Sequence, residues 1–369
     1  MTESLSNSEQ EEVKTFKDLD KEVIQKDLCC ACGACVAYCE SQSFDVIKLD
    51  EYIPKFKSKK NEDNCTECGL CYYICPQTDT LEELLVENLE IQDELGHIID
   101  IIAAKTTREA INKVGQDGGI VTTILSYLFE KNKIDAAVVS EYDEELHPKP
   151  KLIFDKEELL KSAGTRYSIS SQVLPLKDLY NIPLQIQKEK GIYDIDQIRV
   201  AFVGTPCQVK ALRKMKLLSI KPAHVVKYII SLFCFENFEY STLYELIRKD
   251  KGIKPSDIKK TYIKKNFFVE SEKGDTLEVN IKNLDPAVRS HCKVCDDFAG
   301  RFSDISVGST GAPENYSIII TRTEPGQKLI ETLLSQKYID QYIPPRDKET
   351  DWREKRKNFF RKMISRKSK

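Results

Sequence analysis

The chain has 369 residues, 41% of them hydrophobic, which is enough for a sizeable core and more than one domain. Its formal net charge of −3 gives it no polycationic character, so nucleic acid is not an expected partner. Its longest apolar runs, such as 228–235, are too short to span a bilayer, and its polar, acidic start resembles neither a signal peptide nor a transit peptide. These features predict a soluble, cytoplasmic protein.

Two cysteine motifs near the N-terminus share one spacing. In each motif the cysteines are separated by two, two and three residues, and a proline follows the second motif. This is the spacing of bacterial ferredoxins, in which three thiolates bind one [4Fe-4S] cluster and the fourth reaches the other cluster. It predicts one cluster on Cys29, Cys32, Cys35 and Cys75, and a second cluster on Cys65, Cys68, Cys71 and Cys39.

Other uses of these cysteines are less consistent with the pattern. In a reducing compartment, 13 cysteines favour metal ligation over a disulfide framework. Zinc is the alternative metal, but it often uses two separated cysteine pairs. Two details depart from the ferredoxin pattern: Glu40 stands where a proline often follows, and Cys30 is a spare thiol beside Cys29. Spacing alone selects Cys29 as the ligand, so Cys30 stays open. The segment 41–63 between the motifs predicts a short hairpin.

An α/β region is expected after a polar helical link at 80–96. Apolar residues recur at helical spacing from Ile120 to Phe129, directly after Asp117-Gly118-Gly119, and the run 134–140 predicts a buried strand. Gly-Gly at a helix start suits phosphate, because free N–H groups and the helix dipole favour anions. A plain turn is the commoner use of such a pair.

The loop 162–172 suits a phosphorylated ligand that carries a ring, although an ordinary surface loop is the alternative. It offers Gly164 for close approach, Thr165 as a hydroxyl donor, Arg166 as a charge and Tyr167 as a flat ring.

Two later strands are expected to end beside cysteines. The runs 200–203 and 224–236 predict strands buried on both faces, the first leading through a tight turn to Cys207 and the second ending at Cys234. Because ligands gather at the carboxyl ends of parallel strands, both thiols are expected to face one crevice. With the pair Cys292 and Cys295 they predict a third [4Fe-4S] cluster. A zinc site, or Cys207 and Cys234 as small buried hydrophobes, are the alternatives.

Together these motifs resemble the family of coenzyme F420 hydrogenase/dehydrogenase beta subunits. The resemblance extends from about residue 24 to 325 through CCACGACVAYC, CTECGLCYYICP, QDGGIVTTIL, AGTRY, VGTPCQ, LFCFE, CKVCDDF and DISVGSTGAPENYSIIITRT. With its two-cluster ferredoxin part, the chain is most similar to electron-input subunits of archaeal F420H2 dehydrogenases. The resemblance implies FAD as cofactor, coenzyme F420 as substrate and iron–sulfur clusters as the exit path for electrons.

The matching motifs also imply which residues hold the flavin. FAD is expected to contact Gly118, Gly119, Thr122, Gly164, Thr165, Arg166 and Tyr167, with Gly204, Thr205 and Gln208 near the ring or the cluster. Weaker candidates for the anionic tail of coenzyme F420 are Lys264, Lys265, Arg289 and Arg301, for each of which a solvated surface is the alternative. Hydride transfer needs no general acid or nucleophile, so no catalytic side chain is expected.

The predicted fold is an α+β two-cluster ferredoxin-like domain followed by an α/β flavin-binding domain. The expected boundaries are a disordered N-terminus (1–22), the ferredoxin domain (23–90), the flavin-binding domain with the third cluster (91–345) and a basic amphipathic tail (346–369). Nine Lys or Arg residues and one Glu give 352–369 a charge of +8, which leaves −11 on the rest. On a helix the tail would place Phe359, Phe360, Met363 and Ile364 on one side.

The tail is expected to dock on an acidic partner or, peripherally, on an anionic membrane. A frayed terminus is the alternative.

The predicted function is hydride exchange between reduced coenzyme F420 and FAD, with single electrons passing through the clusters to a partner complex. That partner would be a hydrogenase, heterodisulfide reductase, respiratory or formate dehydrogenase module, acting as donor or acceptor. Two alternatives stay open: a ferredoxin-driven flavin reductase of another substrate, similar to hydroxymethyl chlorophyll reductases, and an electron-transfer polyferredoxin with no substrate of its own.

Overall fold

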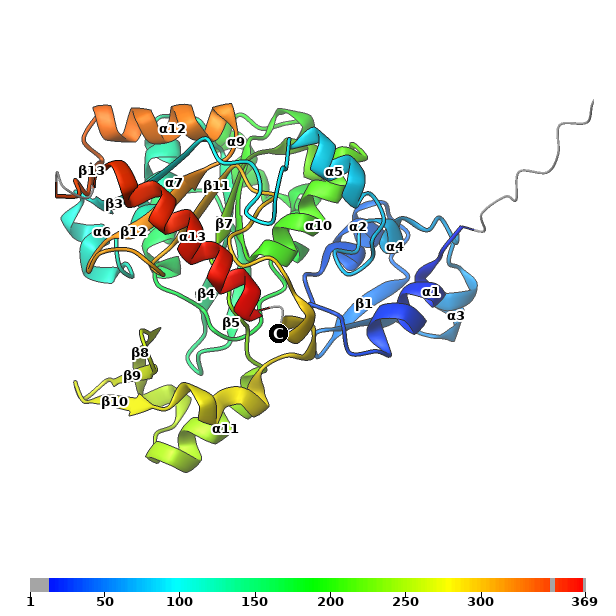
Figure 1. Ribbon diagram of the computed structural model, residues 1–369. Helices are drawn as coiled ribbons and strands as arrows, with labels where there is room; N and C mark the ends of the chain where they lie inside the picture. Colours follow the sequence, from blue (N-terminus) through cyan, green and yellow to red (C-terminus); the bar gives the residue numbers. More distant parts are fainter. Residues whose placement is uncertain (1–12, 346–348, 368–369) are drawn as a thin grey trace, which may run out of the picture.

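The computed structural model describes residues 13–345 and 349–367. The first part of the chain forms a small domain that contains both ferredoxin motifs, and a larger α/β domain follows (Figure 1). The sheets have two, three and eight strands. The eight-stranded sheet, with helices packed along it, positions the third set of cysteines.

The N-terminal domain is built from short elements around the cysteine loops. They are α1 (Phe16–Leu19), α2 (Ala34–Ser41), β1 (Ile47–Asp50), β2 (Ile53–Phe56), α3 (Lys59–Asp63), α4 (Leu70–Tyr73) and α5 (Glu82–Asn88). Strands β1 and β2 pair antiparallel, which confirms the predicted hairpin. The predicted helical link is shorter than expected: α5 ends at Asn88, and Leu95 beyond it is buried in the core of the α/β domain.

The predicted disorder of the N-terminus is wrong from residue 13 onward. Phe16 and Leu19 of α1 are buried, and Thr15 closes the start of this helix with a capping box to Asp18. The apolar side chains pack beside the cysteines of α2, so this segment closes one side of the ferredoxin domain. Residues 1–12 of the predicted disordered segment lie outside the described residues.

The large sheet has the strand order β13-β3-β12-β11-β7-β6-β4-β5. Its strands are β3 (Asp100–Thr106), β4 (Ala136–Tyr142), β5 (Pro148–Ile153), β6 (Val200–Gly204), β7 (Val226–Leu232), β11 (Ile305–Gly308), β12 (Ser317–Thr321) and β13 (Ile339–Gln341). Strands β4, β6, β7 and β11 run parallel to one another. Their carboxyl ends therefore lie at one edge, as the sequence predicts for the strands at 200–203 and 224–236.

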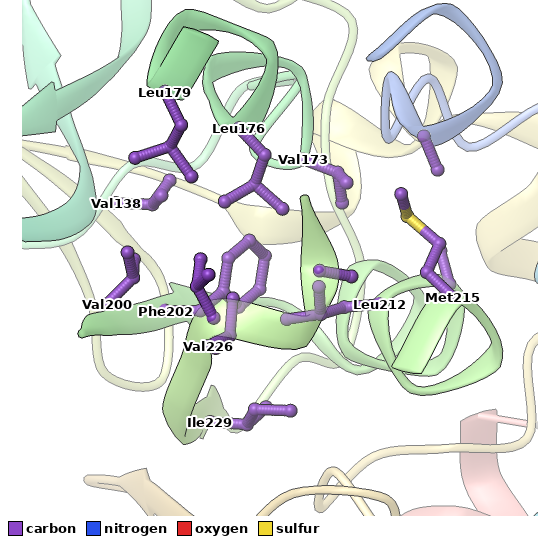
Figure 2. Close-up of a cluster of buried hydrophobic side chains, with 14 of the residues drawn as sticks. Val138, Val173, Leu176, Leu179, Val200, Phe202, Leu212, Met215, Val226 and Ile229 are labelled. Carbon is purple, nitrogen blue, oxygen red and sulfur yellow. The ribbon is translucent and has the colours of Figure 1, made fainter. Parts of the chain in front are cut away.

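Helices cover the sheet and bury its central strands. They are α6 (Glu109–Val114), α7 (Ile120–Glu130), α8 (Lys156–Leu159), α9 (Leu184–Lys190), α10 (Pro206–Leu217) and α12 (Glu324–Ser335). Every residue of β6 is buried. Figure 2 shows Phe202 of β6 among Leu176 and Leu179 of a 3₁₀ segment, with Leu212 and Met215 of α10 nearby. This packing fixes α10, the helix that begins at the carboxyl end of β6.

A second, smaller unit was not predicted from the sequence. It contains α11 (Tyr240–Lys251) and the antiparallel sheet of β8 (Ile258–Ile263), β9 (Phe267–Ser271) and β10 (Thr276–Val279). Phe267 and Val269 of β9 are buried with Leu243 and Ile247 of α11. This unit lies below the large sheet in Figure 1 and is inserted between β7 and the segment with Cys292.

The C-terminal segment forms one helix, α13 (Glu349–Lys367), which crosses the α/β domain (Figure 1). The tail is helical, as the prediction assumed, but its apolar residues pack on the chain itself rather than on a membrane or a partner. Phe360 is fully buried, and its ring lies 5.2 Å from the ring of Phe233, measured between centroids. The acidic surface that the basic helix meets belongs to the chain itself: Arg361 pairs with Asp93 at 2.7 Å. The apolar face is therefore unavailable to a membrane or partner while α13 stays packed.

Among the described residues, no helix is both long and apolar enough to cross a membrane. Residues 346–348 and 368–369 of the predicted tail lie outside the described residues.

Phe360→Ala is expected to lower the free energy of unfolding by about 3–5 kcal/mol, the usual cost of deleting a buried aromatic ring. Phe359→Ala is the matched control. The ring of Phe359 is next to Phe360 but only partly buried, so a clearly smaller loss of unfolding free energy is expected. Chemical denaturation of both variants measures the difference. Equal losses would show that α13 does not pack through Phe360.

Candidate iron–sulfur and flavin site

The ferredoxin cysteines gather as the spacing predicts. One cavity is lined by the predicted first set, Cys29, Cys32, Cys35 and Cys75, together with Leu19 and Val23. In the predicted second set, Cys39 and Cys71 each lie close enough to Cys65 and Cys68 to interact electrostatically. The fourth cysteine of each motif is thus exchanged between the sets, as in two-cluster ferredoxins.

Cys29 and Cys30 occupy different places, which the spacing alone did not establish. The Cys29 thiol interacts electrostatically with Cys35 and Cys75, which are both in the first set. The Cys30 thiol lies within hydrogen-bonding reach of Cys32 on one side and Cys207 on the other. The structure therefore favours Cys29 as the ligand and places Cys30 between two groups of cysteines.

The remaining four cysteines line a second cavity. Cys207 follows β6, Cys234 follows β7, and Cys292 and Cys295 come from the segment after the inserted unit. The expectation that the thiols after the two parallel strands face one crevice is confirmed. Binding of a cluster by these four residues stays a prediction.

The turn that presents Cys207 is fixed by a capping box. The Thr205 N–H donates to Oε1 of Gln208 at 2.9 Å, and Pro206 occupies the first helical position. The Gln208 side chain also donates to the carbonyl of Ser170 at 2.6 Å. Gln208 thus ties the β6–α10 turn to the 162–172 loop, and both segments line the cavity.

The thiols of this cavity suit a metal group that binds thiolates. Burial raises the pKa of Cys234 to about 12, with Cys207 and Cys295 adding to the shift. When a metal binds such buried thiols, it displaces their protons and is held by the resulting thiolates. Lys367 also lines the cavity; burial lowers its pKa, but the surrounding thiols outweigh this effect and the net shift is upward. The donor set and its cation thus fit an anionic iron–sulfur cluster.

The predicted flavin residues at the start of α7 are placed by packing. A Cβ on Gly118 would lie 2.5 Å from the carbonyl oxygen of Ala104, and its N–H donates to Ser317 at 3.1 Å. Gly119 begins the helix with φ of +64°, and Thr122 is buried one turn later. Gly118 is therefore required by contact with two strands, and its N–H is already bonded. Contact of these residues with FAD stays a prediction.

The predicted residues of the 162–172 loop also have partners within the chain. The Arg166 guanidinium lies over the ring of Tyr142 at 4.4 Å and donates to the carbonyl of Ala163 at 2.8 Å. The Tyr167 hydroxyl accepts from Ile263 N–H at 3.0 Å, which joins this loop to the inserted unit. Gly164 has φ of +92°, and the carbonyl of Thr165 accepts a hydrogen bond from the Tyr142 hydroxyl. These features help to fix the backbone of the loop.

Several buried polar atoms near the cysteine cavity have no partner among the described residues. Asn237 Oδ1 and His291 Nδ1 belong to residues that line it, and the hydroxyls of Ser168 and Ser171 flank it. An unpaired buried polar atom costs about 1–3 kcal/mol, so such atoms usually face a ligand or water. The sequence analysis singled out the 162–172 loop that contains the two serines, but it named none of these four side chains. Their position fits a polar cofactor such as a flavin beside the third cysteine set.

The weaker candidates for the coenzyme F420 tail are not brought together. Lys264 is exposed and lies 3.9 Å from Glu314, and Lys265 is also exposed. Arg289 donates to the carbonyl of Cys29 at 2.9 Å. Arg301 is nearly buried and pairs with Asp296 and Glu82, so the two arginines already have partners in the chain.

Comparisons with known proteins agree with this arrangement. Residues 22–82 match a 4Fe-4S dicluster domain, and residues 101–177 and 198–344 match the N-terminal and C-terminal parts of coenzyme F420 hydrogenase/dehydrogenase beta subunits. The chain is 31% identical to a subunit of the F420H2 dehydrogenase of Methanosarcina mazei, over 86% of both chains. It is 30% identical to the coenzyme F420-dependent sulfite reductase of Methanocaldococcus jannaschii, over 84% of this chain but 46% of that protein.

A solved structure is similar as well. A chain of the F420-reducing [NiFe] hydrogenase complex of Methanosarcina barkeri superimposes with a TM-score of 0.64 at 28% identity, covering 75% of this chain and 91% of that chain.

Fold and cysteine sets together define an oxidoreductase subunit with a 4Fe-4S dicluster domain joined to an α/β domain. The chain belongs to the family of coenzyme F420 hydrogenase/dehydrogenase beta subunits.

Proposed function

We propose that this chain exchanges hydride with coenzyme F420 through bound FAD and passes electrons singly to a partner complex through three [4Fe-4S] clusters. One observation carries the proposal: Cys30 lines both the cavity of the first ferredoxin set and the cavity of the third cysteine set. The two proposed cluster sites therefore share a wall, which is the arrangement that electron transfer between them requires.

Helix α10 holds the two domains in this relation. Its first turn contributes Cys207 to the third set, and Lys214 on the same helix donates to the carbonyls of Cys75 at 2.6 Å and Thr78 at 2.8 Å. Lys210 pairs with Glu82 at 2.6 Å. On the other side of the cavity, Val173 N–H donates to the carbonyl of Cys32 at 2.9 Å. These contacts join the α/β domain to the ferredoxin domain, and they support a fixed separation between the two proposed cluster sites.

Coenzyme F420 exchanges hydride, whereas the clusters pass single electrons. A flavin would connect them, because it accepts a hydride and releases single electrons. The residues proposed to hold it are those at the start of α7 and in the 162–172 loop, with Gly204, Thr205 and Gln208 beside the cluster. The unpaired atoms of Ser168, Ser171, Asn237 and His291 support a polar ligand at this place. These residues would bind and orient the cofactor, and none is needed for proton transfer.

The partner is proposed to be a redox complex that accepts or donates single electrons. Similar proteins include a subunit of an F420H2 dehydrogenase and the beta subunits of coenzyme F420 hydrogenases, which by name belong to such assemblies. The tail is not proposed as the docking element, because the apolar face of α13 is buried.

Steady-state oxidation of reduced coenzyme F420 tests the proposal. Anaerobically purified chain, supplied with FAD, is expected to oxidise it with a one-electron dye as acceptor, and recovery of the visible absorbance band of the deazaflavin measures the rate. A chain that retains iron but no flavin, and that leaves reduced coenzyme F420 untouched, would contradict the proposal and favour a polyferredoxin.

A further inference from the structure

The last turn of α13 brings a cation to the third cysteine set. Lys367 is 6% exposed, lines the cavity beside Cys207, Cys234, Cys292 and Cys295, and donates its Nζ to the carbonyl of Cys234 at 2.6 Å. Figure 1 shows the end of the helix beside the gold segment that follows the inserted unit. No other Lys or Arg lines this cavity among the described residues.

The remainder of the helix is anchored, so Lys367 is held in place. Ile364 and Phe360, one and two turns earlier, are buried in one cluster with Phe298 and Ile101. Arg361 binds Asp93, and Arg356 donates to the carbonyl of Gly311. A long side chain loses considerable rotamer freedom when it is buried, and these contacts offset that cost.

The charges around Lys367 explain why a cation is buried at this position. A lone buried cation is costly unless anions surround it. The carboxylate of Asp297 lies near the cavity, but it already accepts from the N–H groups of Gly300 and Arg301. The thiols of all four cysteines interact electrostatically with Lys367, as does the carboxyl of Glu236. A cluster on four thiolates is an anion, and one-electron reduction adds a further negative charge beside the ammonium group.

We infer that Lys367 tunes the third cluster: its fixed positive charge stabilises the reduced, more negative cluster and raises its reduction potential. Attraction between opposite charges is strong where water is excluded, and cluster potentials depend on nearby charge and hydrogen bonds. The inference rests on the proposed function, because it requires the third cluster. It also assigns the C-terminal helix a role inside the chain.

A redox titration of the whole chain, monitored by electron paramagnetic resonance, tests this role. Lys367→Gln removes the charge, Lys367→Arg keeps it, and Lys362→Gln removes an exposed lysine from the same helix. Lys367→Gln is expected to shift the ratio of reduced to oxidised third cluster about tenfold toward oxidised at a given potential, which is about 59 mV for one electron. The other two variants are expected to stay near the native value.

Iron content separates failure of the inference from failure of the proposed function. A native potential in Lys367→Gln with full iron would overturn the inference alone. A native chain with only about eight irons and no third signal would overturn both the cluster and the role of Lys367. Loss of about four irons in Lys367→Gln but not in Lys367→Arg would support a required cation, whereas the same loss in both variants would reduce Lys367 to a packing residue.

Discussion

Cys207→Ser is expected to separate two activities of the chain. Electron transfer from reduced coenzyme F420 to a one-electron dye should fall by about 100-fold or more, because mutating residues that only orient metal ligands already costs about 10- to 100-fold. Reduction of bound flavin should stay near the native rate, because the residues proposed to hold the flavin are untouched. Stopped-flow absorbance measures both rates in one sample.

The geometry of Cys207 explains why the effect should be selective. Its thiol lies at the start of α10, within reach of the Cys30 thiol and 3.4 Å from the Thr205 hydroxyl. A serine hydroxyl would keep the packing but would not bind iron as a thiolate does. Cys30→Ser is the matched control, since it changes the adjacent thiol without removing a proposed ligand. Native rates for both steps in Cys207→Ser would show that Cys207 is a buried packing residue.

The second prediction concerns two adjacent thiols with different roles. Cys29→Ser is expected to lose about four of about twelve irons per chain, because the Cys29 thiol lies close to those of Cys35 and Cys75 in the first set. Cys30→Ser is expected to keep all of them, since Cys30 lies between two complete sets. Iron analysis of anaerobically purified protein, together with zinc analysis, measures the difference.

Three other outcomes would change these assignments. The reverse pattern would make Cys30 the ligand. Equal losses in the two variants would indicate that the loop itself had been disrupted. About eight irons with one zinc in the native chain would remove the third cluster and leave the ferredoxin domain in place.

The sequence predicted the features that depend on local spacing. Cysteine spacing within each motif defined both ferredoxin sets, because a short loop can place its thiolates in few ways. The buried runs of β6 and β7 were recognisable from their unbroken apolar residues, and strand direction then brought Cys207 and Cys234 together. Strand ends are less well predicted, as with the run 224–236, in which β7 covers only Val226–Leu232.

What the sequence missed depends on contacts between distant segments. The inserted sheet went unrecognised because charged residues interrupt the alternation of β8, in which Lys259 and Lys260 lie side by side. The destination of α13 required knowing that Asp93 and Asp100 form an acidic surface beside the core that receives Phe360. A basic, amphipathic helix looks alike whether its partner is a membrane, another protein or its own domain.

The candidate site shows the same division. Motif matching selected segments in which Gly118 allows close backbone contact and Arg166 stacks on Tyr142. Contact of these segments with FAD stays a prediction. Cys30 appeared spare in the sequence, and its position between two cavities follows only from docking of the ferredoxin domain on α10. Lys367 is far from every cysteine in the sequence, so no local pattern could connect them.

The most direct test of the central claim is a single turnover without any added acceptor. Anaerobic protein containing FAD and iron is mixed with reduced coenzyme F420, and the deazaflavin absorbance and the paramagnetic signals of the clusters are followed together. We expect oxidation of the deazaflavin to be accompanied by reduced-cluster signals, and Cys207→Ser to keep the first change and lose the second. Clusters that stay oxidised in the native chain while the deazaflavin is consumed, or a deazaflavin that does not react at all, would contradict the claim.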